Sequence, residues 1–129
     1  DALPILINKY SASDGDLFPW SFKANKIGKV IGTRTWGGIV GISGPLPYMD
    51  GTDVRVPFFT NYDAKTGQWI VENHGVDPDI LIDNDPVKEQ SGEDQQLNKA
   101  IEVILQELKD RKPLPSVPAP RTYKDLGVE

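Results

Sequence analysis

The chain has 129 residues, 38% of them hydrophobic, which is enough for one domain with one hydrophobic core. Its 14 Lys and Arg against 19 Asp and Glu give a net charge of −5, so binding to nucleic-acid phosphates or to an anionic membrane surface is disfavoured. The absence of cysteine excludes disulfides, thiolate zinc sites and a thiol nucleophile, and a single histidine excludes a histidine-rich metal site.

The beginning of the sequence is an apolar run rather than a targeting segment. Asp1 is followed almost at once by strand-like residues 3–7, without the basic opening and long apolar run of a signal peptide. No run of about 18 apolar residues occurs elsewhere, so no transmembrane helix is predicted. Because the sequence starts directly before a core strand, we expect it to be a fragment of a larger enzyme.

The first third of the chain predicts a strand, a helix and a second strand. Residues 3–7 are short and apolar, which is typical of a fully buried strand. A helix should follow the turn, beginning near Asp16 because Pro19 is tolerated only in a first turn, and ending at Gly28. Residues 29–33 then form a second short strand, and this order favours a parallel pair.

The middle of the chain predicts loops and an antiparallel hairpin. The glycine-rich residues 36–47 suit short strands and close approach of the backbone to a ligand or another chain. Residues 52–60 alternate apolar and polar side chains, which indicates a half-buried strand, and Pro57 suggests the edge of a sheet. Residues 68–73 are expected to return as its partner, and residues 80–82 form another short apolar run.

The last third predicts a long helix and an extended arm. Between residues 92 and 112, apolar side chains recur at spacings of three and four, as in an amphipathic helix that packs on a core: Leu97, Ile101, Ile104, Leu105 and Leu108. Four prolines then follow within eight residues, which is too dense for a helix. We divide the chain into residues 1–112 and a proline-rich C-terminal arm, residues 113–129.

Ser13 lies where the first predicted strand turns into the first helix. There its hydroxyl would be exposed beside the free amides of a helix N-terminus, as a nucleophilic serine requires. The amide of Asp14 would point toward the oxyanion formed when Ser13 attacks a carbonyl. The alternative is that Ser11, Ser13 or Asp14 only caps the helix, the ordinary role of such residues before a helix.

Three segments together resemble the catalytic core of the tricorn protease family, serine peptidases related to the C-terminal processing peptidases. They are residues 5–18, which include the Ser-Ala-Ser-Asp-Gly-Asp run, residues 32–38 and residues 71–79. The resemblance extends over residues 3–110. It implies an α/β fold, the ClpP/crotonase-like layered sandwich with a mostly parallel sheet, an antiparallel hairpin and a long C-terminal helix.

The resemblance also implies roles for individual residues. Ser13 matches the nucleophile, the Asp14 amide matches one oxyanion donor, and Glu72 matches the acid of a Ser-His-Ser-Glu tetrad. The processing peptidases have a lysine base 25 positions after the serine, where this chain has Gly38, so the tricorn branch is favoured. Trp36 and Gly37 are expected to line the substrate cleft.

The base is expected to lie outside this chain. The resemblance places the histidine, the second serine and the other oxyanion donor upstream of the nucleophile, so the fragment alone should be inactive. His74 follows Glu72 by two residues and would face the same way in a strand, but it precedes Gly75 in a loop, and we expect it to have a surface or packing role. No cofactor or metal is expected, because the aspartates lack the spacing of a calcium loop.

The resulting functional hypothesis is a serine endopeptidase or oligopeptidase that forms an acyl-enzyme on Ser13. Its expected partners are a peptide or unfolded-protein substrate, the upstream remainder of its own enzyme and further copies in a homo-oligomer. No nucleic acid or membrane is expected, and the cytoplasm is the expected compartment. The alternative is a non-catalytic peptide-binding or assembly module that uses the glycine-rich segment and the proline arm.

Overall fold

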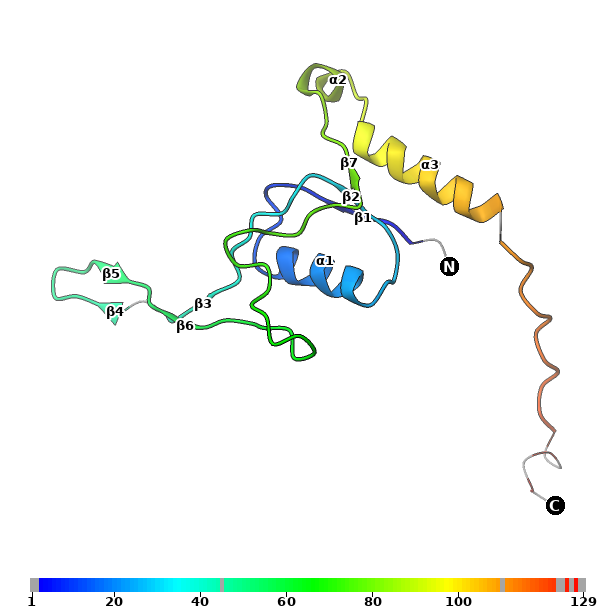
Figure 1. Ribbon diagram of the computed structural model, residues 1–129, viewed down its shortest axis with the longest axis horizontal. Helices are drawn as coiled ribbons and strands as arrows, with labels where there is room; N and C mark the ends of the chain where they lie inside the picture. The colour runs from blue at the N-terminus through cyan, green and yellow to red at the C-terminus, as the bar shows by residue number, and fades with distance from the viewer. Residues whose placement is uncertain (1–2, 45, 110, 123–124, 126, 128–129) are drawn as a thin grey trace.

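A three-stranded parallel sheet forms the centre of the chain (Figure 1). The computed structural model describes residues 3–44, 46–109, 111–122, 125 and 127. The sheet has the order β1–β2–β7, from Ile5–Ile7, Val30–Gly32 and Ile80–Leu81. The helices are α1 (Asp14–Ala24), α2 (Pro86–Gln90) and α3 (Gln95–Lys109). Two antiparallel pairs complete the fold, from β3 (Gly41–Ile42), β4 (Leu46–Pro47), β5 (Asp53–Val54) and β6 (Pro57–Phe59).

The predicted strand, helix and strand unit is confirmed. β1 and β2 pair in parallel with Ile5 opposite Val30, and α1 connects them. The helix begins at Asp14, earlier than expected, so Pro19 lies beyond its first turn. Because proline has no N–H group, α1 lacks one of its internal hydrogen bonds.

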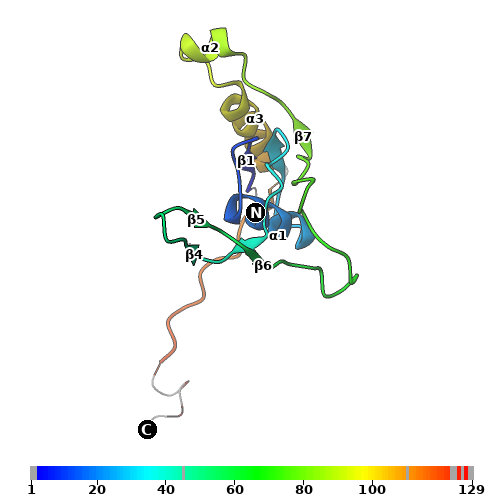
Figure 2. The same ribbon diagram turned by 90° about the vertical axis from the view of Figure 1, so that its left-hand side faces the viewer.

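Helices pack against both faces of the sheet. Val30 is buried with Ile7 and Phe22, and Phe22 belongs to α1. Ile31, whose side chain points to the opposite face, is equally buried, and α3 contacts the same two strands. Figures 1 and 2 show α1 and α3 running along different sides of β1 and β2. The chain is therefore a layered α/β structure, as predicted.

A second buried cluster holds the long central loops against α1. It contains Ile39, Ile70, Val71 and Val76, with Leu17 and Trp20 of α1 packed on it. Each of these loop residues lies outside the strands of the central sheet. Hydrophobic burial therefore helps to hold the loops that precede β7, together with backbone hydrogen bonds such as that from the amide of Asn73 to the carbonyl of Gly37 at 2.8 Å.

The antiparallel pairing differs in detail from the sequence prediction. β6 pairs with β3 and β5 pairs with β4, so the segment of residues 52–60 finds its partners upstream. In the described part of the chain, the expected return strand, residues 68–73, is joined by one isolated bridge between Tyr62 and Trp69 and then enters a turn. Val71 has φ 64°, which a strand cannot accommodate. The ribbon of β4 and β5 projects away from the rest of the molecule (Figure 1).

The long C-terminal helix is confirmed, but the face that it buries is not the expected one. Its buried residues are Gln96 and Ala100, and the Gln96 side chain donates to the carbonyl of Ile82 at 3.0 Å. Most of the predicted apolar stripe is exposed: Leu97, Ile101, Leu105 and Leu108. The side of α3 that packs on β1 and β2 thus carries the small Ala100 and the hydrogen-bonded amide of Gln96. The larger apolar side chains of the stripe lie on the exposed side of the helix.

Helix α2 and residues 113–122 are exposed parts of the chain. Helix α2 was not predicted, although Asp85 caps it and Pro86 occupies its first turn, which are ordinary start signals. Residues 113–122 are exposed and form no helix or strand, and residues 123, 124, 126, 128 and 129 of the predicted arm lie outside the described residues. None of the helices described here is long and apolar enough to cross a membrane.

Two phenylalanines of α1 allow a matched test of the core. Phe22 is 2% exposed and Phe18 is 61% exposed, although their rings lie 5.9 Å apart. We expect Phe22→Ala to lower the free energy of unfolding by about 3 to 5 kcal/mol, because it leaves a cavity between α1 and the sheet. Phe18→Ala should cost under about 1 kcal/mol, the range of ordinary surface changes. Thermal unfolding of both variants measures the difference, and equal losses would contradict this packing.

Candidate active site

Ser13 occupies a strained turn at the start of α1. Its φ of 56° and ψ of −112° lie outside the usual regions for a residue with a side chain, at a cost of about 1 to 3 kcal/mol. Its hydroxyl makes no capping bond to α1 among the residues described, and the Ser11 hydroxyl instead accepts from the amide of Asn8 at 3.1 Å. Neither serine caps the helix through its side chain, so the sharp turn leaves the Ser13 hydroxyl free for other contacts.

The backbone around Ser13 presents an open amide at the helix N-terminus. The carbonyl of Ser13 accepts from the amides of Asp16 and Leu17 at 2.9 and 3.0 Å, which begins the helical bonding. The amide of Asp14 comes before these and has no acceptor among the described residues. A helix N-terminus carries partial positive charge, so this amide is suited to an anionic oxygen.

The glycine-rich segment after β2 lies against the same end of α1. The amide of Trp36 donates to the carbonyl of Ser11 at 2.9 Å. The amides of Gly37 and Gly38 donate to the carboxylate of Asp16 at 2.8 and 3.2 Å. Gly37 has φ +86°, and a Cβ atom there would lie 2.5 Å from the amide nitrogen of Gly75, so a glycine is required.

The carboxylate of Glu72 binds the two residues that follow Gly37 and Gly38 in the sequence. One of its oxygens, Oε2, accepts from the amide of Ile39 at 2.7 Å and from that of Val40 at 2.9 Å. Glu72 itself sits in a tight turn, where its amide donates to the carbonyl of Ile70 at 2.6 Å across Val71. A turn of this kind with φ 64° at a β-branched residue is strained, and the burial of Val71 holds it in place.

One cavity of about 400 Å³ brings the predicted site residues together. Ser13, Asp14, Trp36 and Glu72 all line it, although they come from three separate parts of the sequence. Gly37 does not line it, and its neighbour Gly38 does. The remaining lining residues are largely apolar: Leu17, Ile39, Val40, Gly41, Ile42, Phe59 and Asn61. This size and composition suit the binding of a small molecule or of a few peptide residues.

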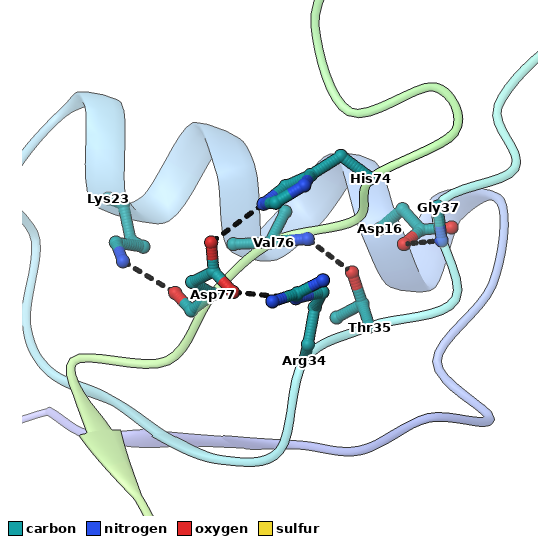
Figure 3. Close-up of polar contacts among 8 residues, drawn as sticks. All are labelled: Asp16, Lys23, Arg34, Thr35, Gly37, His74, Val76 and Asp77. Atoms are coloured by element: carbon teal, nitrogen blue, oxygen red, sulfur yellow. Dashed lines mark hydrogen bonds and ion pairs between the residues drawn. The ribbon is translucent and has the colours of Figure 1, made fainter.

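His74 belongs to a different cluster (Figure 3). Its Nε2 lies 2.7 Å from Oδ2 of Asp77, whose other oxygen accepts from Nε of Arg34 at 2.7 Å. Because residues 71–74 form turns rather than a strand, the alternation expected to turn Glu72 and His74 the same way does not apply. His74 does not line the cavity, and its side chain is 59% exposed.

The polar groups near the cavity do not form a metal site. In the part of the chain that is described, no three His, Asp or Glu side chains are grouped so that they could hold a metal ion. The carboxylates of Asp16 and Glu72 accept from backbone amides instead.

Comparison with known proteins identifies the family. The profile of Peptidase family S41 matches residues 2–82, well over half of the chain. The chain belongs to peptidase family S41. This match covers β1 to β7 and includes all the residues named at the cavity.

Individual relatives agree with this assignment. A tricorn protease of Thermoplasma volcanium is 45% identical over 83% of this chain. A crystal structure of the tricorn protease has 44% identity and a TM-score of 0.75 over 83% of the chain, and a photosystem II D1 C-terminal processing protease has 28% identity and a TM-score of 0.50 over 64%. The chain spans about 10% of the length of the tricorn proteases that it matches.

Sequence reasoning on this S41 chain missed Asp16. This carboxylate is fully buried and contacts the glycine segment, yet an acid in the first turn of a helix is explained well enough by the helix dipole. The helical period does not separate Asp16 from Asp14 either, because the bonds of Asp16 to Gly37 and Gly38 join residues 21 and 22 positions apart.

The contacts of Asp77 predict a pH dependence of stability. The hydrogen bond from His74, followed by that from Arg34, holds the pKa of the Asp77 carboxyl below its ordinary value of 3.8. Since the folded pKa is the lower one, the stabilisation is complete above pH 3.8 and is lost as the pH falls through the folded pKa. We expect Asp77→Asn to lower the unfolding temperature at pH 7. Between pH 5 and pH 2 the unfolding temperature of the variant should decrease by less than that of the wild type, as measured by circular dichroism. An unchanged pH profile would contradict these contacts.

Proposed function

We propose that this chain carries the nucleophile and the tetrad acid of a tricorn-like serine peptidase. The observation that carries the proposal is the shared cavity. It is lined by Ser13, by Asp14 with its open backbone amide, and by the acid Glu72. The S41 family match supports a serine-type peptidase, and the Ser13 turn resembles the strained turns that expose nucleophiles. Residues 1–112 would form this part of the catalytic domain, and residues 113–129 an extended arm.

The proposed reaction is acyl transfer to Ser13. The Ser13 oxygen attacks the carbonyl carbon of a peptide bond while its proton passes to a histidine base, and the amide of Asp14 donates to the oxyanion. The intermediate then expels the amine, which takes the proton from the histidine. Water activated by the same histidine hydrolyses the acyl ester and regenerates Ser13.

Glu72 is well placed for the role of the acid. Both amide contacts use Oε2, which leaves Oε1 without a partner among the described residues and available to a hydroxyl. In the proposed tetrad that hydroxyl is the second serine, through which Glu72 orients and stabilises the histidine. Its partial burial strengthens such a hydrogen bond by excluding water.

The base is proposed to come from the upstream remainder of the enzyme. His74 pairs with Asp77 outside the cavity, and it is the chain's one histidine. This chain alone would then be inactive, and activity would need the full-length polypeptide. The proposed substrates are oligopeptides or unfolded proteins, and the enzyme is proposed to act as a homo-oligomer in the cytoplasm.

Labelling with a fluorophosphonate tests the nucleophile without a guess about the substrate. We expect the full-length enzyme to be labelled at Ser13 and the Ser13→Ala variant to lose both labelling and nearly all peptide hydrolysis, because the acyl acceptor is removed. Intact-mass spectrometry and peptide mapping measure the label. Ser91→Ala, which alters an exposed serine bonded to the carbonyl of Lys88, is the control and should react normally.

Three outcomes would each contradict a part of the proposal. Unchanged hydrolysis by Ser13→Ala would exclude Ser13 as the nucleophile. Peptide binding without hydrolysis or labelling by the wild-type enzyme would favour the non-catalytic peptide-binding module. Labelling of the isolated 129-residue chain would show that the base lies within it, against the proposed upstream histidine.

Glu72→Gln tests the acid while preserving the fold. The glutamine oxygen can still accept from the amides of Ile39 and Val40, so the loop stays bound. Because the negative charge beside the proposed second serine is lost, we expect kcat to fall about 10²- to 10⁴-fold. Glu102→Gln on the exposed side of α3 is the control, and steady-state kinetics of both variants measure the effect. A kcat close to wild type for Glu72→Gln would exclude a role for its charge.

A further inference from the structure

We infer that Asp16 is a positioning residue of the peptidase. Its carboxylate sets the distance between the nucleophile and the cavity wall by binding the backbone amides of Gly37 and Gly38. The inference rests on the proposed function of Ser13. It concerns a side chain that does not line the cavity and is not among the proposed tetrad members.

Asp16 connects two segments through its own backbone and side chain. Its amide donates to the carbonyl of Ser13 at 2.9 Å. Its carboxylate accepts from Gly37 with Oδ1 at 2.8 Å and from Gly38 with Oδ2 at 3.2 Å. One residue therefore ties the nucleophile's turn to the segment that continues into the cavity wall.

Burial makes this connection rigid. Asp16 is 0% exposed, and a buried carboxylate without strong partners is costly. Both of its oxygens are occupied by backbone amides, which form charge-assisted hydrogen bonds. Movement of either glycine away from α1 would leave an unpaired charge in a site that water does not reach, so the segment is held in one place.

Asp16 and Glu72 together bind a continuous run of amides. Residues 37 and 38 donate to Asp16, and residues 39 and 40 donate to Glu72. In an extended strand, successive amides point in opposite directions, whereas here four in a row converge on two carboxylates, as in an anion-binding nest. We name residues 37–40 with these two carboxylates the amide clamp.

The clamp relates the nucleophile to the acid without direct contact between them. Ser13 is bonded to Asp16, Asp16 to the first half of the clamp, and the second half to Glu72. A shift of the glycines would thus move the cavity wall and the acid relative to Ser13. A misplacement of about 1 Å in an active site can lower the rate about 10²-fold.

Asp16→Asn in the full-length enzyme tests the inference. The asparagine oxygen can accept from one glycine amide, but its NH₂ group cannot accept from the other, so half of the contact is lost with little change in volume. We expect kcat and the rate of fluorophosphonate labelling at Ser13 to fall about 10- to 100-fold. Hydrogen exchange measured by mass spectrometry should become faster in the peptide that covers residues 36–41.

Asp79→Asn is the matched control. The Asp79 carboxylate also accepts from a backbone amide, that of Val30 at 2.9 Å, and pairs with Lys23 of α1, but it does not line the cavity of Ser13. We expect this variant to lower the unfolding temperature through the loss of these contacts, yet to keep kcat and labelling within about twofold of wild type. The comparison separates positioning from a general loss of stability.

The outcomes distinguish the two proposals. If the wild type is labelled at Ser13 and Asp16→Asn reacts within twofold of it, Asp16 is not a positioning residue and the proposed function stands. Equal losses of kcat in Asp16→Asn and Asp79→Asn would also overturn the inference, because stability alone would explain them. A wild-type enzyme without labelling at Ser13 would overturn the proposed function and, with it, this inference.

Discussion

The structure around the cavity depends on one buried charge, the carboxylate of Asp16. Removing a carboxylate from water costs several kcal/mol unless its oxygens are matched. Here the matching groups are the backbone amides of Gly37 and Gly38, which must approach closely and, at Gly37, adopt φ +86°. The two glycines and the acid thus form a mutual constraint, since each requires the other where the segment meets α1.

Backbone strain at two residues is held by packing rather than by the residues themselves. Ser13 and Val71 have φ values of 56° and 64°, each at a cost of about 1 to 3 kcal/mol. Val71 is buried with Ile39, and Leu17 of α1 packs against the same cluster. Burial of each large apolar side chain contributes about 1.5 to 3 kcal/mol, so the cluster can offset both strained turns. The unusual conformations beside the cavity are therefore compatible with a stable fold.

The sequence predicts those features that depend on neighbouring residues. The period of the apolar residues reveals β1 and α3, and the position of Ser13 between a strand and a helix identifies it as a candidate nucleophile. Long-range features do not follow from local patterns. The alternation in residues 52–60 indicates a strand but not its partner. Glu72 is identified only through the family resemblance, because its carboxylate binds backbone amides that lie 32 and 33 positions away in the sequence.

The topology explains why Glu72 depends on the amide clamp for its orientation, whereas the segment of Ser13 already follows a strand end of the sheet. The carboxyl ends of parallel strands lie at one edge of a sheet, so β1 and β2 bring the segments of Ser13 and Trp36 together, and the amide of Trp36 bonds the carbonyl of Ser11 there. Glu72 precedes β7, and its loop runs back along β2 to the amino end of the sheet before that strand begins. No strand end fixes Glu72 at the cavity. The amides of residues 39 and 40 supply the orientation that the sheet cannot.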